Sequence, residues 1–114
     1  PREFADVANR ILDAFDDLVD WFTAQGTFQT YYNELCKLAI DHVLLAASVR
    51  VIKADPKHPL LGRFLSYMDE KFPDYMENPY LGELSRSRKL LVSLLRKKRY
   101  GMVKLLFAVK DAMK

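Results

Sequence analysis

Apolar residues recur at three- and four-residue steps through the first part of the chain, which is the spacing of one face of an α-helix. Aspartates occupy positions between them and supply a polar face. Gly26 follows, and glycine readily adopts the left-handed conformation that closes a helix. The pattern predicts an amphipathic helix over about residues 4–25. Its apolar stripe comprises Phe4, Val7, Ala8, Ile11, Leu12, Phe15, Leu18, Val19 and Phe22.

A second seam of apolar positions, again at steps of three and four, predicts a second helix. Further apolar residues widen its face, so we expect this helix to be the most buried one. A hydroxyl from Thr27 or Thr30 is expected to cap its start. Pro56 ends it, because a proline disfavours helical geometry at the preceding residue, Asp55. The seam comprises Leu35, Leu38, His42, Leu45, Val49 and Ile52.

Prolines divide the second half of the chain into shorter helices. Pro59 suits the first turn of a third helix, and Pro73 ends it. Residues 74–77 are predicted to form a short loop or a single helical turn. The apolar face of the third helix comprises Leu60, Leu61, Phe64, Leu65, Met68 and Phe72.

Asn78 and Pro79 favour the start of a fourth helix, because asparagine caps a helix and proline fits its first turn. This helix is predicted to run from Tyr80 to about Arg99, and Gly101 is expected to separate it from a last helix. The alternative starting residues are Ser85 and Ser87. The inward positions of the two helices are Leu81, Leu84, Leu91, Leu94, Leu95, Val103, Leu106, Val109 and Met113, with Phe107 on a flank.

No segment alternates as a strand does over a useful length, and no internal repeat is evident. A chain of 114 residues has the usual size of one domain. We therefore expect an all-α fold, with about five helices in one compact, bundle-like domain that spans residues 1–114. The last two helices are expected to be basic and amphipathic.

Charge is distributed unevenly, although the formal net charge is only +3. Residues 1–80 hold 8 Lys or Arg against 13 Asp or Glu, whereas residues 81–114 hold 10 against 2. The two parts carry −5 and +8, so we expect them to face different partners. The single cysteine, Cys36, excludes an internal disulfide and fits a reducing, cytoplasmic setting.

Candidate catalytic and metal-binding groups are few. His42 lies in the apolar seam without a second His or Cys at ligand spacing, so we interpret it as a partly buried structural histidine. Four aspartates of the first helix are interpreted as a solvated face, because a helix surface spreads carboxylates outward. No phosphate-binding loop, nucleophile elbow or Cys–His pairing occurs. The aspartates are Asp13, Asp16, Asp17 and Asp20.

Basic residues alternate with leucines through the last third of the chain. Three interpretations stay open: cationic amphipathic helices on an anionic membrane, a basic surface for nucleic acid, or leucines that face the core beneath a solvated basic face. Nucleic acid is the least favoured of these. The candidate membrane or partner contacts are Arg86, Lys89, Arg96, Lys97, Lys98, Arg99 and Lys104.

A series of short motifs runs through most of the chain. They are Tyr31-Tyr32-Asn33-Glu34-Leu35, Ala46-Ala47-Ser48, Asp55-Pro56-Lys57-His58-Pro59-Leu60-Leu61-Gly62-Arg63-Phe64, Phe72-Pro73, Asn78-Pro79-Tyr80 and Arg99-Tyr100-Gly101-Met102-Val103-Lys104-Leu105-Leu106-Phe107. Together they resemble the C-terminal helical region of bacterial family 2 glycosyltransferases, which build exopolysaccharide, capsule or other cell-surface glycans. The matching positions are mostly structural.

The resemblance implies a non-catalytic accessory part of an enzyme that transfers a sugar from a nucleotide-sugar donor to a cell-surface glycan acceptor. Such enzymes bind the nucleotide sugar and a divalent metal in a separate N-terminal domain, and no catalytic, cofactor or metal residue transfers to this chain. The expected partners are that catalytic domain, an anionic membrane surface at the inner face of the plasma membrane, or a second copy. The alternative is a non-enzymatic helical module for protein–protein interaction or dimerisation.

Overall fold

All regular structure in residues 2–113, the backbone that the computed structural model describes, is helical, which confirms an all-α fold. Side chains are described for residues 6–113. Five main helices are present, one of them a continuous central helix made of α2, a π-helical segment η1 and α3. The elements are α1 (Arg2–Ala24), α2 (Tyr32–Ala39), η1 (Ile40–Ala47), α3 (Ser48–Ala54), α4 (Leu60–Lys71), the 3-10 segments η2 (Tyr75–Glu77) and η3 (Pro79–Glu83), α5 (Arg86–Arg96) and α6 (Tyr100–Ala112).

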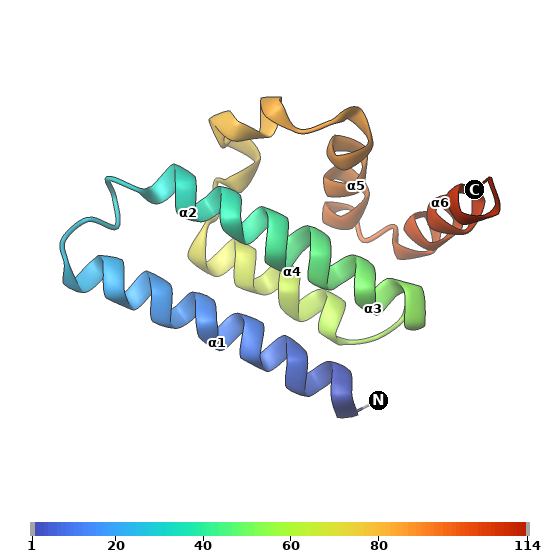
Figure 1. Cartoon of the computed structure of the whole chain (residues 1–114), viewed down its shortest axis with the longest axis horizontal. Coiled ribbons are helices and arrows are strands. Elements are labelled where there is room, and N and C mark those ends of the chain that lie inside the picture. The colour runs from blue at the N-terminus through green and yellow to red at the C-terminus, as the bar shows by residue number, and fades with distance from the viewer. Residues whose placement is uncertain (1, 114) are drawn as a thin grey trace.

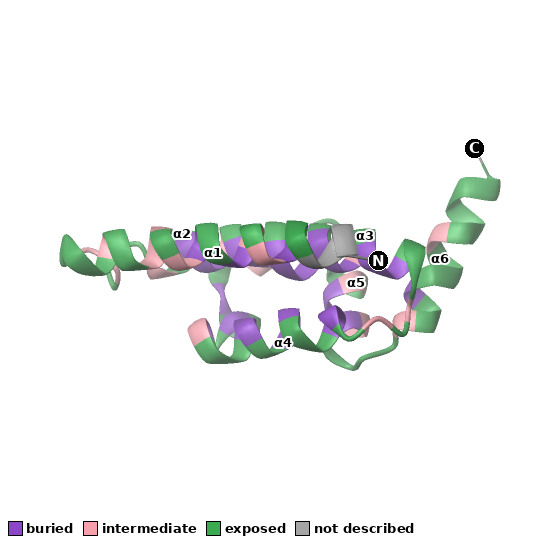
Figure 2. Cartoon of the chain, turned by 90° about the horizontal axis from the view of Figure 1, so that it is seen from below, coloured by how far each residue is buried: buried purple, intermediate pink, exposed green. Residues whose placement is uncertain are grey.

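The helices pack in two layers, and one helix projects from them. α1 and the central helix run antiparallel in one layer, and α4 lies in a second layer (Figure 1, Figure 2). α5 packs against η1, on the side of the central helix away from α1 (Figure 1). α6 extends outward beyond these layers (Figure 2). The Cα radius of gyration is 14.6 Å, above the roughly 13 Å of a compact domain of this length, because α6 projects.

Buried residues on the central helix form neighbouring pairs that repeat every four residues. A step of four exceeds the roughly 3.6 residues of an α-helical turn, so in an unbroken α-helix the stripe would rotate by about 40° per step. The eight residues of η1 have the wider turns of a π-helix, which rotate the stripe back. One face of the helix therefore stays in the core. The pairs are Leu35 and Cys36, Ala39 and Ile40, Val43 and Leu44, Ala47 and Ser48, and Val51 and Ile52, and Leu45 is buried beside the third pair.

Two expectations for this helix are wrong. Leu38 and His42 fall between the buried pairs and are exposed, so the predicted partial burial of His42 is wrong. The His42 ring centroid lies 6.5 Å from that of Phe15 at the edge of the core. The predicted threonine cap is also wrong, because the helix begins after Tyr31, whose side chain makes no capping hydrogen bond.

The apolar faces of the first and third predicted helices pack largely as expected. All six residues predicted for the third helix are buried, and α1 faces the core except at Val7, which is exposed. The side chain of Phe4 lies outside the described residues.

Asp16 of α1 accepts a hydrogen bond of 3.0 Å from the Tyr67 hydroxyl of α4, and burial together with this bond raises the pKa of Tyr67. Cys36 is buried, which raises the pKa of its thiol.

Two helices end on a residue in the left-handed conformation. Gly26 ends α1 with φ at 73°, as predicted. Lys98 ends α5 with φ at 60°, and its N–H donates to the Leu95 carbonyl at 3.0 Å. The Arg99 N–H donates to the Leu94 carbonyl at 2.9 Å. This pair of bonds is the Schellman motif, which turns the chain sharply after a helix.

The fourth predicted helix is shorter than its main prediction. Asn78 and Pro79 start only the 3-10 segment η3, and α5 begins after Ser85, the alternative start, whose hydroxyl accepts a hydrogen bond from the Arg88 N–H. Gly101 does not separate the helices, contrary to expectation, because it lies inside α6. The break between α5 and α6 is instead the Schellman motif at Lys98, three residues before Gly101.

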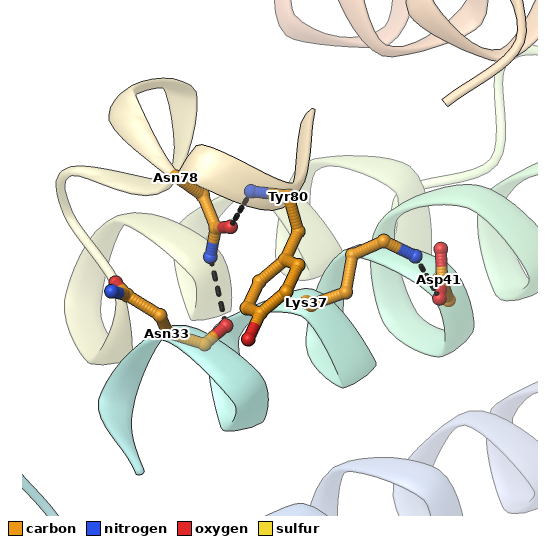
Figure 3. Close-up of polar contacts among 5 residues, drawn as sticks. All are labelled: Asn33, Lys37, Asp41, Asn78 and Tyr80. Atoms are coloured by element: carbon orange, nitrogen blue, oxygen red, sulfur yellow. Dashed lines mark hydrogen bonds and ion pairs between the residues drawn. The ribbon is translucent and has the colours of Figure 1, made fainter. Parts of the chain in front are cut away.

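Asn78 fastens the segment between α4 and α5 to the central helix (Figure 3). Its side-chain amide donates to the Asn33 carbonyl at 2.9 Å, and its side-chain oxygen accepts from the Tyr80 N–H at 2.8 Å. Asn78 is only 6% exposed, so water cannot readily replace these partners. Beside it, Lys37 and Asp41 form an ion pair at 2.5 Å (Figure 3). The asparagine thus fixes the approach of the chain to α5.

Replacing Lys98 with glycine should raise the free energy of unfolding, measured by urea denaturation. The left-handed conformation costs a residue with a side chain roughly 1–2 kcal/mol, and the freedom of glycine in the unfolded chain offsets part of this. We expect a net gain of about 0.5 kcal/mol. The matched change Gly26→Ala should lower stability by about 1 kcal/mol, since the added Cβ meets nothing within 4 Å and only the backbone conformation matters. A less stable Lys98→Gly variant would contradict this assignment.

Replacing Asn78 with alanine should destabilise the protein by about 2 kcal/mol, because a cap is lost and the partly buried hydrogen bond to the Asn33 carbonyl is lost. Asn78→Asp keeps the acceptor for the Tyr80 N–H but buries a carboxylate oxygen against the Asn33 carbonyl oxygen, so it should cost at least as much. Thermal and urea denaturation of the two variants measure the difference. An unchanged midpoint for Asn78→Ala would contradict the buried double contact.

Candidate functional site

The basic residues predicted as contacts lie on α5, on α6 and on the link between them, and all of them are exposed. Arg86, Lys89 and Arg96 are spaced by three and seven residues, so they share one face of α5. The Schellman motif then gathers four consecutive cations at the junction with α6. We call these residues the basic cluster: Arg96, Lys97, Lys98 and Arg99.

α6 docks on the rest of the protein through a narrow strip. Val103 is 0% exposed, while Tyr100 and Phe107 are partly buried against the core. At the end of α3, the Lys53 ammonium lies 4.7 Å from the centroid of the Phe107 ring, a cation–π contact. Lys104 lies three residues before Phe107, so helical geometry places it near this docked side. It is the one predicted contact that lies on α6.

The opposite side of α6 presents an apolar face to solvent. Of the residues of the last helix that were predicted to face inward, only Val103 is buried, and Met113 is 81% exposed. Leu105, which was not among the predicted inward positions, is 56% exposed. α6 is apolar on two sides, so periodicity could not tell which side docks. We call the exposed stripe the α6 outer face: Met102, Leu105, Leu106, Val109 and Met113.

A groove of about 210 Å³ connects the α6 outer face to α5. Leu90, an exposed residue of α5, lines it from the other side. Lys110 lines it too and lies four residues after Leu106, at the border of the outer face. The sequence prediction did not include Lys110, because an apolar run over residues 105–109 separates it from the other cations. The lining residues are Ser87, Leu90, Leu91, Leu106, Phe107 and Lys110.

The other candidate groups do not converge on a site. Asp13, Asp17 and Asp20 are exposed along α1, as a solvated face requires, whereas Asp16 is partly buried and bonded to Tyr67. Within residues 6–113, no group of three or more His, Cys, Asp or Glu side chains is placed to hold a metal ion. The projecting α5–α6 end is therefore the best-formed candidate.

Among the described helices, none combines the length and the apolar character needed to cross a membrane. Comparisons of the chain with protein-family models, with curated proteins and with solved structures found no match. The residues of the α5–α6 end thus supply the basis for a functional proposal.

Tyr100 offers a test of how α6 docks. Its hydroxyl is buried without a hydrogen-bond partner among the described residues, and burial raises its pKa. An unpaired buried hydroxyl costs roughly 1–3 kcal/mol, so Tyr100→Phe should leave the free energy of unfolding unchanged or raise it by up to about 1 kcal/mol. Tyr100→Ala, which removes the ring, should lower it by about 2 kcal/mol. A clear loss of stability in Tyr100→Phe, seen in urea denaturation, would contradict this docking.

Proposed function

We propose that the chain is a non-catalytic helical domain that attaches a glycosyltransferase to an anionic membrane surface. The observation that supports attachment is the presence, on one projecting end, of the α6 outer face and the basic cluster together. A bilayer with anionic lipids offers negative headgroups to the cations and an apolar interior to the leucines. Under this proposal the domain works at the inner face of the plasma membrane.

Charge and apolar burial both contribute to such binding. Each basic residue near an anionic leaflet contributes about 1 kcal/mol, so the basic cluster contributes about 4 kcal/mol. The exposed leucines, valine and methionines add the free energy of leaving water, which is roughly 25 cal/mol for each Å² removed. The attraction between charges weakens with salt, and the apolar contribution does not. The salt dependence of binding can therefore separate the electrostatic contribution from the apolar one.

The enzymatic part of the proposal draws on the resemblance of residues 31–107 to the C-terminal region of family 2 glycosyltransferases. The parent enzyme would transfer a sugar from a nucleotide sugar to a cell-surface glycan acceptor. Its separate N-terminal domain would hold the nucleotide sugar and a divalent metal. When the glycan acceptor is held at a membrane, attachment of the enzyme to the same membrane raises the effective concentration of the acceptor at the enzyme.

The coding sequence upstream of Pro1 tests the enzymatic part. An in-frame, strand-rich nucleotide-binding domain with an Asp-x-Asp motif is the expected finding. A start codon directly before Pro1 would contradict the link to a glycosyltransferase and would leave membrane attachment standing.

Charge reversal at the basic cluster tests attachment. Arg96, Lys97, Lys98 and Arg99 replaced together by glutamate should lower binding to vesicles of equal parts phosphatidylcholine and phosphatidylglycerol by more than about 100-fold. Co-sedimentation at low and high salt measures it, and binding of the unchanged chain should weaken as salt rises. No binding of the unchanged chain at low salt would remove the membrane function.

A matched control changes the same amount of charge elsewhere. Arg10, Arg50, Lys57 and Arg63 are exposed on α1, on α3, on the α3–α4 link and on α4. Their joint replacement by glutamate should leave most of the vesicle binding in place, because the projecting end is unchanged. An equal loss in both variants would show that net charge, and not this surface, governs binding.

Self-association is the alternative function of the same surface. A second copy seated on the α6 outer face would make the chain a dimerisation module. Sedimentation velocity over a range of concentrations distinguishes the two functions. A tight dimer that dissociates in Leu105→Ser would favour the module, whereas a monomer that binds anionic vesicles supports attachment.

A further inference from the structure

We infer that α6 lies along the membrane plane and inserts its outer face below the headgroups. This inference rests on the attachment proposed above and goes further, because cations alone could hold the domain at the surface without insertion. The chemistry of α6 favours insertion. Its exposed stripe contains no charged residue, and the stripe extends along the whole helix from Met102 to Met113.

The charged residues of α6 lie where insertion tolerates them. Lys104 and Asp111 are seven residues apart and share the docked side of the helix, away from the outer face. Lys110 borders the outer face beside Leu106, and a lysine there can extend its ammonium group to the headgroups while its stem stays apolar. The basic cluster immediately precedes the first turn of α6, so its side chains are close enough to that helix to reach headgroups when it lies on the surface. A helix that lies flat therefore keeps its cations at the surface.

Insertion requires no rearrangement of the fold. Val103 and Phe107 hold the opposite side of α6 to the rest of the protein. The outer face, on the opposite side of the helix from that contact, is exposed to solvent. The side chains that would enter the bilayer are already exposed. Binding can therefore occur in the conformation described here.

A second exposed apolar surface, at the junction of α1 and α2, differs in its charge. Trp21, Tyr31 and Leu38 are exposed there, with Trp21 57% accessible. Glu34 lines the same groove, and Asp17 lies one helical turn before Trp21. Anionic lipids repel this acidic border and attract the basic one. Charge complementarity therefore selects the α6 outer face for the membrane.

The same asymmetry orients the domain as a whole. α1, with its exposed aspartates, and α5, with its cations, lie on opposite sides of the central helix (Figure 1). An anionic surface attracts one side and repels the other. The domain should therefore bind in one orientation, with α1 held away from the lipid.

Site-specific fluorescence tests insertion. Cys36 is 1% exposed, so a thiol-reactive nitrobenzoxadiazole label added to the folded protein reacts mainly at an introduced cysteine. Leu105→Cys places the label on the outer face, and Asp13→Cys places it on α1. Trp21 is the only tryptophan and reports on the α1–α2 surface without a label. Vesicles of equal parts phosphatidylcholine and phosphatidylglycerol are the probe.

A blue shift and brightening of the label at position 105 on vesicles, with the label at 13 and Trp21 unchanged, is the expected result. Binding without a change at 105 would overturn insertion and leave surface attachment in place. A blue shift of Trp21 fluorescence, with no change in the label at position 105, would show that the α1–α2 surface contacts the lipid and would overturn the inference. A change at 105 that grows with protein concentration in the absence of lipid would mean that a second copy covers the face. Absence of any binding would remove attachment and insertion together.

Polar substitution gives an independent measurement. Leu105→Ser with Val109→Ser should lower the vesicle partition coefficient at least roughly tenfold, because two apolar side chains no longer leave water. Both positions are exposed, so the denaturation midpoint should not fall. Val7→Ser with Leu38→Ser alters exposed apolar residues on α1 and α2 and should leave the partition coefficient unchanged. Equal partitioning of all these variants would contradict insertion.

Discussion

The four-residue repeat of buried pairs on the central helix is the constraint on which the rest of the structure depends. α1, α4 and α5 all contact the η1 segment, so each of them needs the stripe to hold its direction there. In a regular α-helix, residues that repeat every four positions would rotate around the helix axis and leave the core. The π-helical turns correct this drift, and the pairs from Leu35 to Ile52 remain in the core. The wide turns are therefore a packing device in this protein.

Sequence patterns located most helices because their apolar residues face one core and prolines or glycines end them. The third helix, from Leu60 to Lys71, follows its prediction closely. His42 was misplaced because a seam of three- and four-residue steps assumes regular α-geometry, which η1 does not have. The end of α5 was missed because a lysine, Lys98, takes the conformation expected of a glycine. Both errors concern backbone geometry that side-chain periodicity does not encode.

The predicted basic contacts are exposed on one end, but periodicity did not decide which apolar side of α6 stays exposed. α6 is apolar on two sides, and only packing decides that Val103 docks while Leu105 and Val109 face water. Such a stripe is unfavourable in water unless something covers it. The cations beside the α6 outer face favour its burial in anionic lipid. The acidic residues beside Trp21 disfavour anionic lipid at the α1–α2 surface. Local charge distinguishes two surfaces that hydrophobicity alone would treat alike.

Hydrogen–deuterium exchange of the chain with and without anionic vesicles tests the central claim most directly. Insertion withdraws α6 from water and suppresses the opening of its helical hydrogen bonds, so amide exchange there should slow. We predict slower exchange in residues 97–113 when phosphatidylglycerol vesicles are present, with α1 and α4 unchanged. Slower exchange centred on the junction of α1 and α2, or unchanged exchange in residues 97–113 of vesicle-bound protein, would contradict the account.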